Sequence, residues 1–82
     1  MDVLIDASLP DVARWLPRSL GTLTSAGAGQ ARLHGSTADP GWYAGRLAGL
    51  PYAFSVEGSA ELRRATADLE RRLLSSAKPV PQ

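Results

Sequence analysis

Few side chains in this chain could support catalysis. His34 is the only histidine and the chain has no cysteine. A metal site built from several histidine or thiolate ligands is therefore excluded, and a catalytic triad would depend on this one residue. His34 alternates with Arg32 and Ser36, which places it on the polar face of a predicted strand. We interpret it as a surface or interface histidine and predict no catalytic residue, no cofactor and no metal.

Two other patterns resemble functional motifs but favour simpler structural interpretations. Asp2 and Asp6 fall on one face of a predicted strand and could pair as carboxylates. The simpler interpretation is that they keep an edge or an open sheet face soluble. Gly27 and Gly29 form a glycine-rich turn, but no Lys-Ser/Thr pair follows it and it joins two strands. We therefore predict a hairpin turn there, not a phosphate loop.

Nucleic-acid binding is not favoured by the charge or by the aromatic side chains. The formal net charge is only +1. The strands expected at the centre of the sheet, residues 2–7 and 30–36, contain no aromatic ring on which a base could stack. Two arginine pairs occur in the last predicted helix: Arg63 with Arg64, and Arg71 with Arg72. Acidic residues are interleaved with them, which indicates a solvated helix face.

The two tryptophans remain as candidates for an interaction surface. Each is expected near a helix end, where one edge of the indole can stay in water. For Trp15 we favour packing in the core. For Trp42 two interpretations stay open: core packing, or an exposed ring that anchors a subunit interface, where tryptophan is enriched.

Hydrophobic periodicity predicts four strands and three helices. The strands are expected over residues 2–7, 20–24, 30–36 and 51–57. The first helix is expected between a cap at Ser8, with Asp11 as a capping-box partner, and Pro17. Asp39 is expected to cap the second, and Ser59 the third, which extends to about residue 76. Residues 79–82 are expected to be a disordered tail.

Each predicted helix has an apolar stripe, and the stripe of the third helix is expected to be buried. The stripes are Val12, Trp15 and Leu16 in the first helix, Trp42 or Tyr43 with Leu47 and Leu50 in the second, and Leu62, Ala65, Leu69 and Leu73 in the third. The third helix also carries an alternating charge ladder on another face: Glu61, Arg64, Asp68 and Arg72.

The order of elements predicts an α+β domain over residues 1–78. It corresponds to a ferredoxin-like βαββαβ fold with an additional C-terminal helix and a four-stranded antiparallel sheet. Both crossover helices are expected on one side of the sheet, and the other side should be polar, covered by the last helix or covered by a partner. No apolar run approaches the ~20 residues of a membrane span, and we expect a cytoplasmic protein.

Self-association is expected from the small core and the location of the aromatic residues. Eighty-two residues without a disulfide bury little apolar surface, and such domains often gain stability by forming oligomers. Aromatic side chains concentrate around the second helix and the fourth strand. We predict a homodimer with an interface formed by Trp42, Tyr43, Tyr52, Leu69 and Leu73.

The order and spacing of several short motifs resemble a known family of domains. These motifs are Leu16-Pro17, the hairpin of Leu20–Thr24 and Ala31–Leu33, the helix start at Asp39 and Trp42, and the segments Val56-Glu57 and Glu61-Leu62-Arg63. Over about residues 2–76 the chain resembles the C-terminal extension (WCX) domain of bacterial WYL-domain transcriptional regulators. It departs from that pattern at Ser59-Ala60, where the family commonly has Pro-Pro, and at Pro40-Gly41, which separate the Asp from the Trp.

The resemblance implies a non-catalytic regulatory domain that dimerises and transmits a signal. In such regulators a winged helix-turn-helix domain binds DNA and a WYL domain senses an effector. This chain would therefore meet DNA only through domains that it does not contain. The alternative is a small-molecule-binding module of the ACT type, which would need polar groups converging at the helix starts, such as Asp39, Gly41 and Ser59.

Overall fold

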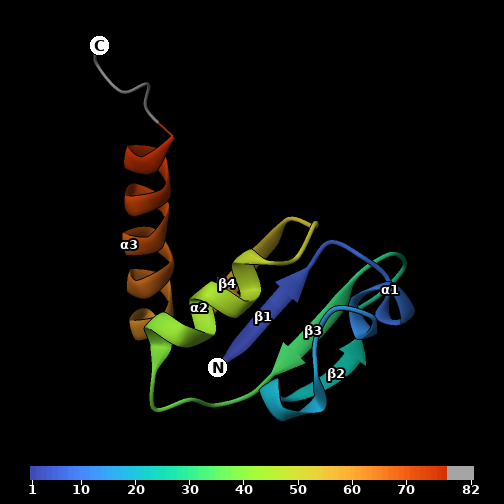
Figure 1. Cartoon of the computed structure of the whole chain (residues 1–82). Helices are drawn as coiled ribbons and strands as arrows, with labels where there is room; N and C mark the ends of the chain where they lie inside the picture. The colour runs from blue at the N-terminus through green and yellow to red at the C-terminus, as the bar shows by residue number, and fades with distance from the viewer. Residues whose placement is uncertain (78–82) are drawn as a thin grey trace.

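The computed structural model describes residues 1–77 and has an α+β architecture with one four-stranded antiparallel sheet (Figure 1). Its elements are β1 (Asp2–Ile5), α1 (Leu9–Ala13), the 3₁₀ turn η1 (Arg18–Leu20), β2 (Thr22–Ser25), β3 (Ala31–His34), α2 (Pro40–Ala48), β4 (Phe54–Glu57) and α3 (Ala60–Ser76). The strand order is β2-β3-β1-β4. The tail predicted over residues 79–82 lies outside the described residues.

Alternation along the strands gives the sheet one apolar and one mainly polar face. Val3 on β1 pairs with Leu33 of β3 on one side and with Val56 of β4 on the other. Ile5 continues this apolar row two residues further along β1 and is fully buried. The opposite face carries Thr22 and Thr24 on β2, Arg32 and His34 on β3, Asp2 and Leu4 on β1, and Ser55 and Glu57 on β4.

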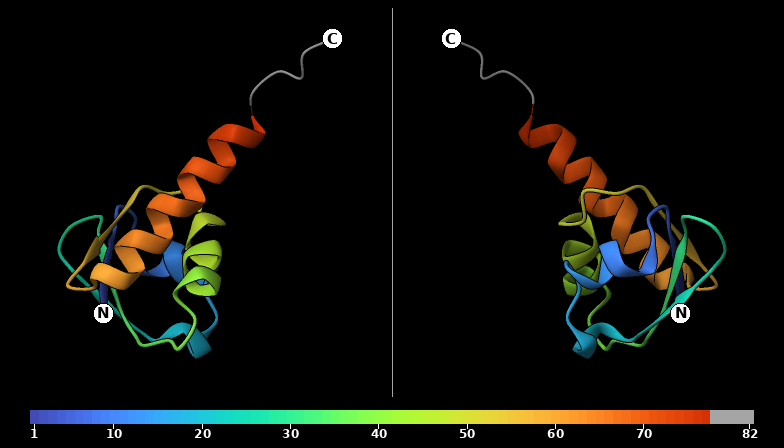
Figure 2. Two further views of the ribbon diagram at one scale, coloured as in Figure 1. Left: turned by 90° about the vertical axis from the view of Figure 1, so that its left-hand side faces the viewer. Right: turned by 90° about the vertical axis from the view of Figure 1, so that its right-hand side faces the viewer.

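The helices cover the apolar face of the sheet. α1 and α2 lie on that face, while α3 begins beside β4 and packs across α2 (Figure 2). Within residues 1–77 no helix lies over the polar face. Of the arrangements expected for that face, cover by the last helix is therefore wrong, and the face is mainly polar. The predicted four-stranded antiparallel sheet and the C-terminal helix are confirmed.

The first helix is shorter than predicted, and Trp15 is not in the core. α1 ends at Ala13, because the following backbone forms hydrogen bonds between residues three apart, as in a 3₁₀ turn. The Arg14 amide donates to the Asp11 carbonyl, and the Trp15 amide donates to the Val12 carbonyl. Trp15 therefore lies beyond the helix and is 51% exposed, which corrects the predicted core position. The Ser8 side chain makes no capping hydrogen bond, so the predicted capping box is also wrong.

The predicted caps of the other two helices are confirmed. The Asp39 carboxylate accepts a hydrogen bond from the Trp42 amide at 3.1 Å, and the Ser59 hydroxyl accepts one from the Leu62 amide at 3.1 Å. Of the two aromatic residues considered for the inner face of α2, Tyr43 is the buried one. The starts of α2 and α3 are therefore each fixed by a local capping hydrogen bond that the sequence pattern predicts.

The predicted apolar stripe of α3 is buried at only one end. Leu62 is fully buried, and Ala65 and Leu69 are partly buried against the core. Leu73 is 54% exposed, which corrects its predicted burial. Figure 1 shows why: the second half of α3 extends beyond α2 and the sheet, where no other described element can cover it. The four residues of the predicted charge ladder are all exposed on α3, and among residues 1–77 the one ion pair within this helix joins Asp68 and Arg71.

A buried hydrogen bond and two glycines hold η1 against the end of β3. The Tyr43 hydroxyl donates to the Leu20 carbonyl at 2.6 Å. Gly21 has φ 145°, and a Cβ at this position would lie 2.3 Å from the His34 carbonyl oxygen. A Cβ at Gly35 would in turn lie 2.3 Å from the Leu20 carbonyl oxygen. Only residues without a Cβ allow the two backbones to cross this closely.

Candidate functional site

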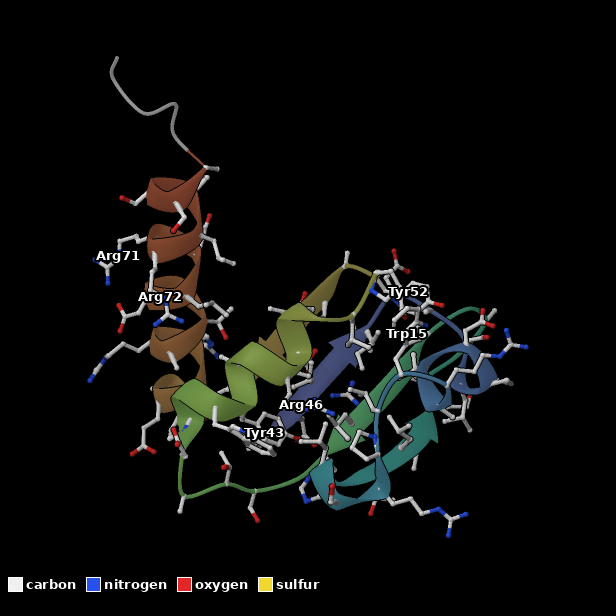
Figure 3. The ribbon with its side chains drawn as sticks, in the orientation of Figure 1. Trp15, Tyr43, Arg46, Tyr52, Arg71 and Arg72 are labelled. Atoms are coloured by element: carbon white, nitrogen blue, oxygen red, sulfur yellow. The ribbon has the colours of Figure 1, made fainter. Side chains whose placement is uncertain are left out.

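The structure separates the residues that were predicted to form one interface. Leu69 and Leu73 lie on neighbouring turns of α3 and line the same groove. Tyr43 is 1% exposed and its side chain belongs to the core beneath α2 (Figure 3). Trp42 is 53% exposed. Tyr52 is half-buried in the segment before β4. Only the two leucines therefore contribute to a common exposed surface.

An apolar groove lies between α2, β4 and the protruding half of α3. It encloses about 420 Å³, and its walls are formed by Ala44 and Ala48 of α2, Phe54 of β4, and Leu69, Leu73 and Leu74 of α3. Leu74 is 60% exposed and, with Leu73, forms the outer rim. We call this surface the α3 groove. Large apolar side chains that stay exposed together are typical of interaction sites.

Trp42 does not belong to the α3 groove. Successive residues of a helix are about 100° apart, so Trp42 lies about 200° around α2 from Ala44. Ala44 faces α3 and is buried. The exposed indole instead shares the solvent side of α2 with Gly45 and Arg46.

The polar face of the sheet carries two cross-strand side-chain pairs. Arg32 Nη1 lies 2.6 Å from Glu57 Oε2, and His34 Nδ1 lies 2.7 Å from Asp2 Oδ1. The hydrogen bond to His34 is the largest influence on Asp2 and lowers the pKa of its carboxyl below the ordinary value. The hydrogen bond to Glu57 raises the pKa of Arg32 further above its already high ordinary value. Arg32 and Glu57 thus pair opposite charges across the sheet, on β3 and β4.

Asp2 and Asp6, the two carboxylates that could have paired on one strand face, form separate contacts. Asp6 follows the end of β1, where its amide donates to the carbonyl of Ala53 at 2.9 Å, and Asp2 pairs with His34 instead. His34 lies on the polar face, as its alternation predicted, and is exposed. The central strands β1 and β3 contain no aromatic residue, as expected. Within residues 1–77, no three histidine, cysteine, aspartate or glutamate side chains gather in a way that could hold a metal ion.

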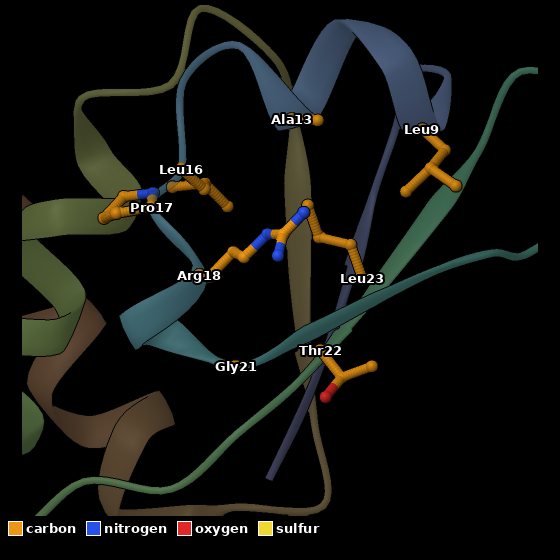
Figure 4. Close-up of a pocket in the computed structure, with 8 residues that line it drawn as sticks. All are labelled: Leu9, Ala13, Leu16, Pro17, Arg18, Gly21, Thr22 and Leu23. Carbon is orange, nitrogen blue, oxygen red and sulfur yellow. The ribbon is translucent and has the colours of Figure 1, made fainter.

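A second pocket opens between α1, η1 and β2 and was not predicted. It encloses about 650 Å³ and is lined mainly by apolar residues: Leu9, Ala13, Leu16, Pro17 and Leu23. Arg18 is the only charged residue in its wall, and its side chain points from η1 into the space (Figure 4). We call it the η1 pocket. The sequence carries no periodic signal for it, because η1 is too short and irregular to produce one.

The polar side chains at the two helix starts considered for an ACT-type module act as helix caps. The Asp39 carboxylate and the Ser59 hydroxyl each accept a hydrogen bond from their own helix. Gly41 faces α3 near Asp68 and Arg72 in a shallow depression. One carboxylate oxygen of Asp39 and the hydroxyl oxygen of Ser59 are thus used in capping.

Comparisons with known proteins give no relative for this chain. No protein-family model matches it, and no curated protein or solved structure is significantly similar to it. Among the described residues, no helix combines the length and the apolar character needed to cross a bilayer.

Proposed function

We propose that this chain is a non-catalytic regulatory and dimerisation domain, and that two copies associate through the α3 groove. The single observation that carries the proposal is the exposure of Leu73 and Leu74 at the rim of an apolar groove. These two leucines lie on a helix that extends past its own domain. In a monomer the protruding half of α3 adds no hydrophobic stabilisation, since its apolar side chains remain in water.

The α3 groove suits a second copy of the chain because it has both a recess and projecting side chains that could fill the same recess in a partner. Its floor is formed by small or partly buried residues of α2 and β4, and its rim carries projecting leucines. A twofold dimer buries the same patch of both subunits, so that the rim of one copy can enter the floor of the other. Four leucines, two from each copy, would leave water in this arrangement, and each fully buried leucine contributes about 1.5–3 kcal/mol.

The finer part of the fold proposal is a ferredoxin-like arrangement. Its support is the chain order of β1, α1, β2, β3, α2 and β4 together with the antiparallel order β2-β3-β1-β4. A split βαβ unit with both crossover helices on one face has this topology. The short α1 and the added turn η1 are departures from a regular version of the fold.

The biological part of the proposal rests on the resemblance to WCX domains of WYL-type regulators. In that context the chain would act in the cytoplasm, would dimerise to transmit a signal, and would meet DNA only through other domains of the regulator. The resembling motifs at Asp39 and at Val56-Glu57 coincide here with the start of α2 and the end of β4. An ACT-like ligand-binding module remains the alternative, and its expected polar groups at the helix starts are already used as caps.

Sedimentation of two matched variants tests the proposed dimer. Leu73→Glu places a charge at the rim, whereas Ser75→Glu places the same charge on an exposed position two residues away. We expect the unmodified chain and Ser75→Glu to sediment as dimers at high micromolar concentration, and Leu73→Glu to sediment as a monomer. At concentrations low enough for both variants to be monomeric, they should unfold at nearly the same temperature, because neither side chain is buried within one copy. A monomeric unmodified chain at these concentrations would contradict the proposal.

A further inference from the structure

The free edge of the sheet beside the η1 pocket has the features of a peptide-binding strand edge. β2 is the outermost strand, and its only partner among the described strands is β3. The Ala26 amide donates to the Gln30 carbonyl at 3.0 Å, which continues the ladder beyond the end of β2. Because bonded and non-bonded pairs alternate in an antiparallel ladder, the pairs Thr24–Arg32 and Thr22–His34 are bonded.

It follows that Leu23 and Ser25 direct their backbone groups away from the sheet. Within residues 1–77, no hydrogen bond from a turn or loop reaches their amides or carbonyls. Such an edge can pair with one more extended strand at a spacing of about 4.8 Å. α1 packs against the apolar face of the sheet at β2, and Figure 1 shows no described element along the outer side of this strand.

The η1 pocket lies on the side of this edge that would receive a side chain. Leu23 points to the apolar face of the sheet and lines the pocket. In an antiparallel pair, directly opposite residues project to the same face, so the residue paired with Leu23 would enter the pocket. The walls formed by Leu9, Leu16 and Pro17 favour an apolar side chain there.

The position of Arg18 indicates which end of a bound peptide strand would lie at the pocket. It precedes β2 in the chain and therefore lies at the N-terminal end of the strand. A segment running antiparallel to β2 has its C-terminal end at that same position. Arg18 forms no ion pair within residues 1–77, and no carboxylate lines the pocket. An arginine without an acidic partner beside an apolar pocket is complementary to a carboxylate.

We propose that the β2 edge and the η1 pocket bind the free C-terminus of an extended peptide. The peptide pairs antiparallel with Leu23 and Ser25, places an apolar side chain in the pocket and directs its terminal carboxylate to Arg18. The buried Tyr43–Leu20 hydrogen bond and the Gly21–Gly35 crossing hold η1 in place, so the site is formed before the ligand arrives. This surface is separate from the α3 groove, and the proposal does not depend on dimerisation.

A labelled peptide tests the proposal. The probe is a synthetic heptapeptide of alternating threonine and valine that ends in leucine, labelled at its N-terminus and prepared as a free acid and as an amide. Fluorescence anisotropy is measured with the full chain, with Arg18→Gln, and with Arg64→Gln as a control that loses one charge on the exposed face of α3.

We expect the free acid to bind the unmodified chain and the Arg64→Gln control at least about tenfold more tightly than the amide. In Arg18→Gln the acid and the amide should bind equally weakly, because the carboxylate and Arg18 act as one pair. In ¹⁵N–¹H spectra, the amides of Leu23 and Ser25 should move on binding, while those of α3 should not.

Several results would overturn the proposal. One is equal affinity for acid and amide in the unmodified chain, or no binding at millimolar peptide. Another is displacement of the peptide by N-acetylleucine at equal concentration, which would indicate a pocket for small acids without strand pairing. A third is a concentration-dependent shift of the Leu23 and Ser25 amides without peptide, because a second copy would then occupy the edge.

Discussion

The hydroxyl of Tyr43 donates a 2.6 Å hydrogen bond to the carbonyl of Leu20, joining the inner face of α2 to the turn η1. Both residues are buried, and desolvation raises the pKa of the Tyr43 hydroxyl above its ordinary value, so the phenol stays neutral and remains a donor. This bond fixes the segment that carries Arg18 and starts β2. The geometry of the η1 pocket therefore depends on a residue that does not line it.

Replacing Tyr43 by phenylalanine should destabilise the domain by about 1–3 kcal/mol. The ring would still fill its place in the core, but the Leu20 carbonyl would lose a buried hydrogen-bond partner. Urea denaturation followed by circular dichroism measures the change. Tyr52→Phe is the control, because Tyr52 is half-buried and no side-chain hydrogen bond is found for it in residues 1–77. Equal effects of the two substitutions would show that the hydroxyl of Tyr43 contributes nothing.

Two glycine-to-alanine substitutions should have opposite effects on stability. At Gly35 the new methyl group would lie 2.3 Å from the Leu20 carbonyl oxygen and 2.8 Å from the Tyr43 hydroxyl, which should cost about 1–3 kcal/mol. Gly45 lies in α2 on the solvent side, where a Cβ meets no atom within 4 Å. Alanine there should raise the free energy of unfolding by up to about 1 kcal/mol. Thermal and urea unfolding of both variants provide the comparison, and a neutral Gly35→Ala would refute the close crossing.

The Asp2–His34 pair predicts a dependence of stability on acid pH. The folded-state pKa of Asp2 is lowered, chiefly by its hydrogen bond to His34. A lowered carboxyl pKa means that the contribution of Asp2 is complete above the unfolded value of about 3.9 and is lost as the pH falls through the lower folded value. In His34→Ala the Asp2 carboxyl should titrate at a higher pH, as ¹³C-detected NMR can measure.

Thr22→Ala is the matched control for that titration. Thr22 pairs with His34 across β2 and β3 on the same sheet face, but it carries no charge. Its replacement should leave the Asp2 titration unchanged. If Asp2 titrated at the same pH in His34→Ala as in the unmodified chain, the bond to His34 would not be the cause of the lowered value.

Removing the cap of α2 should destabilise the domain modestly. Asp39→Ala deletes the acceptor for the Trp42 amide, and a lost N-cap typically costs about 0.5–2 kcal/mol. Asp39→Asn keeps an acceptor oxygen at the same place and should retain most of that stability. Equilibrium unfolding of the pair separates the capping bond from the charge, and an alanine variant as stable as the asparagine variant would exclude the cap as a source of stability.

The elements that were correctly predicted are those whose signals are local. The caps at Asp39 and Ser59 and the alternation around Val3 require only a few neighbouring residues to be recognised. The strand pairing of the sheet could be predicted from these signals, because few strand orders are possible once the order of helices and strands along the chain is known.

The errors concern residues whose environment is determined by distant parts of the chain. Trp15 was assigned to a helical stripe, but α1 ends before it and helical periodicity no longer applies. Leu73 has the correct helical spacing, yet α2 is too short to reach it. Arg18 could not be recognised at all, since its importance arises from a pocket formed by α1, η1 and β2 together.

The crossing of Gly21 and Gly35 has a consequence for how related sequences can diverge. Each glycine lies where a carbonyl group of the other segment leaves no room for a methyl group. The two clashes involve different carbonyl groups, so a change that makes room at one position does not remove the clash at the other. A lineage that keeps η1 packed against the end of β3 must retain glycine at both positions. A lineage that substitutes either one must rebuild the path of the chain between the first helix and the second strand.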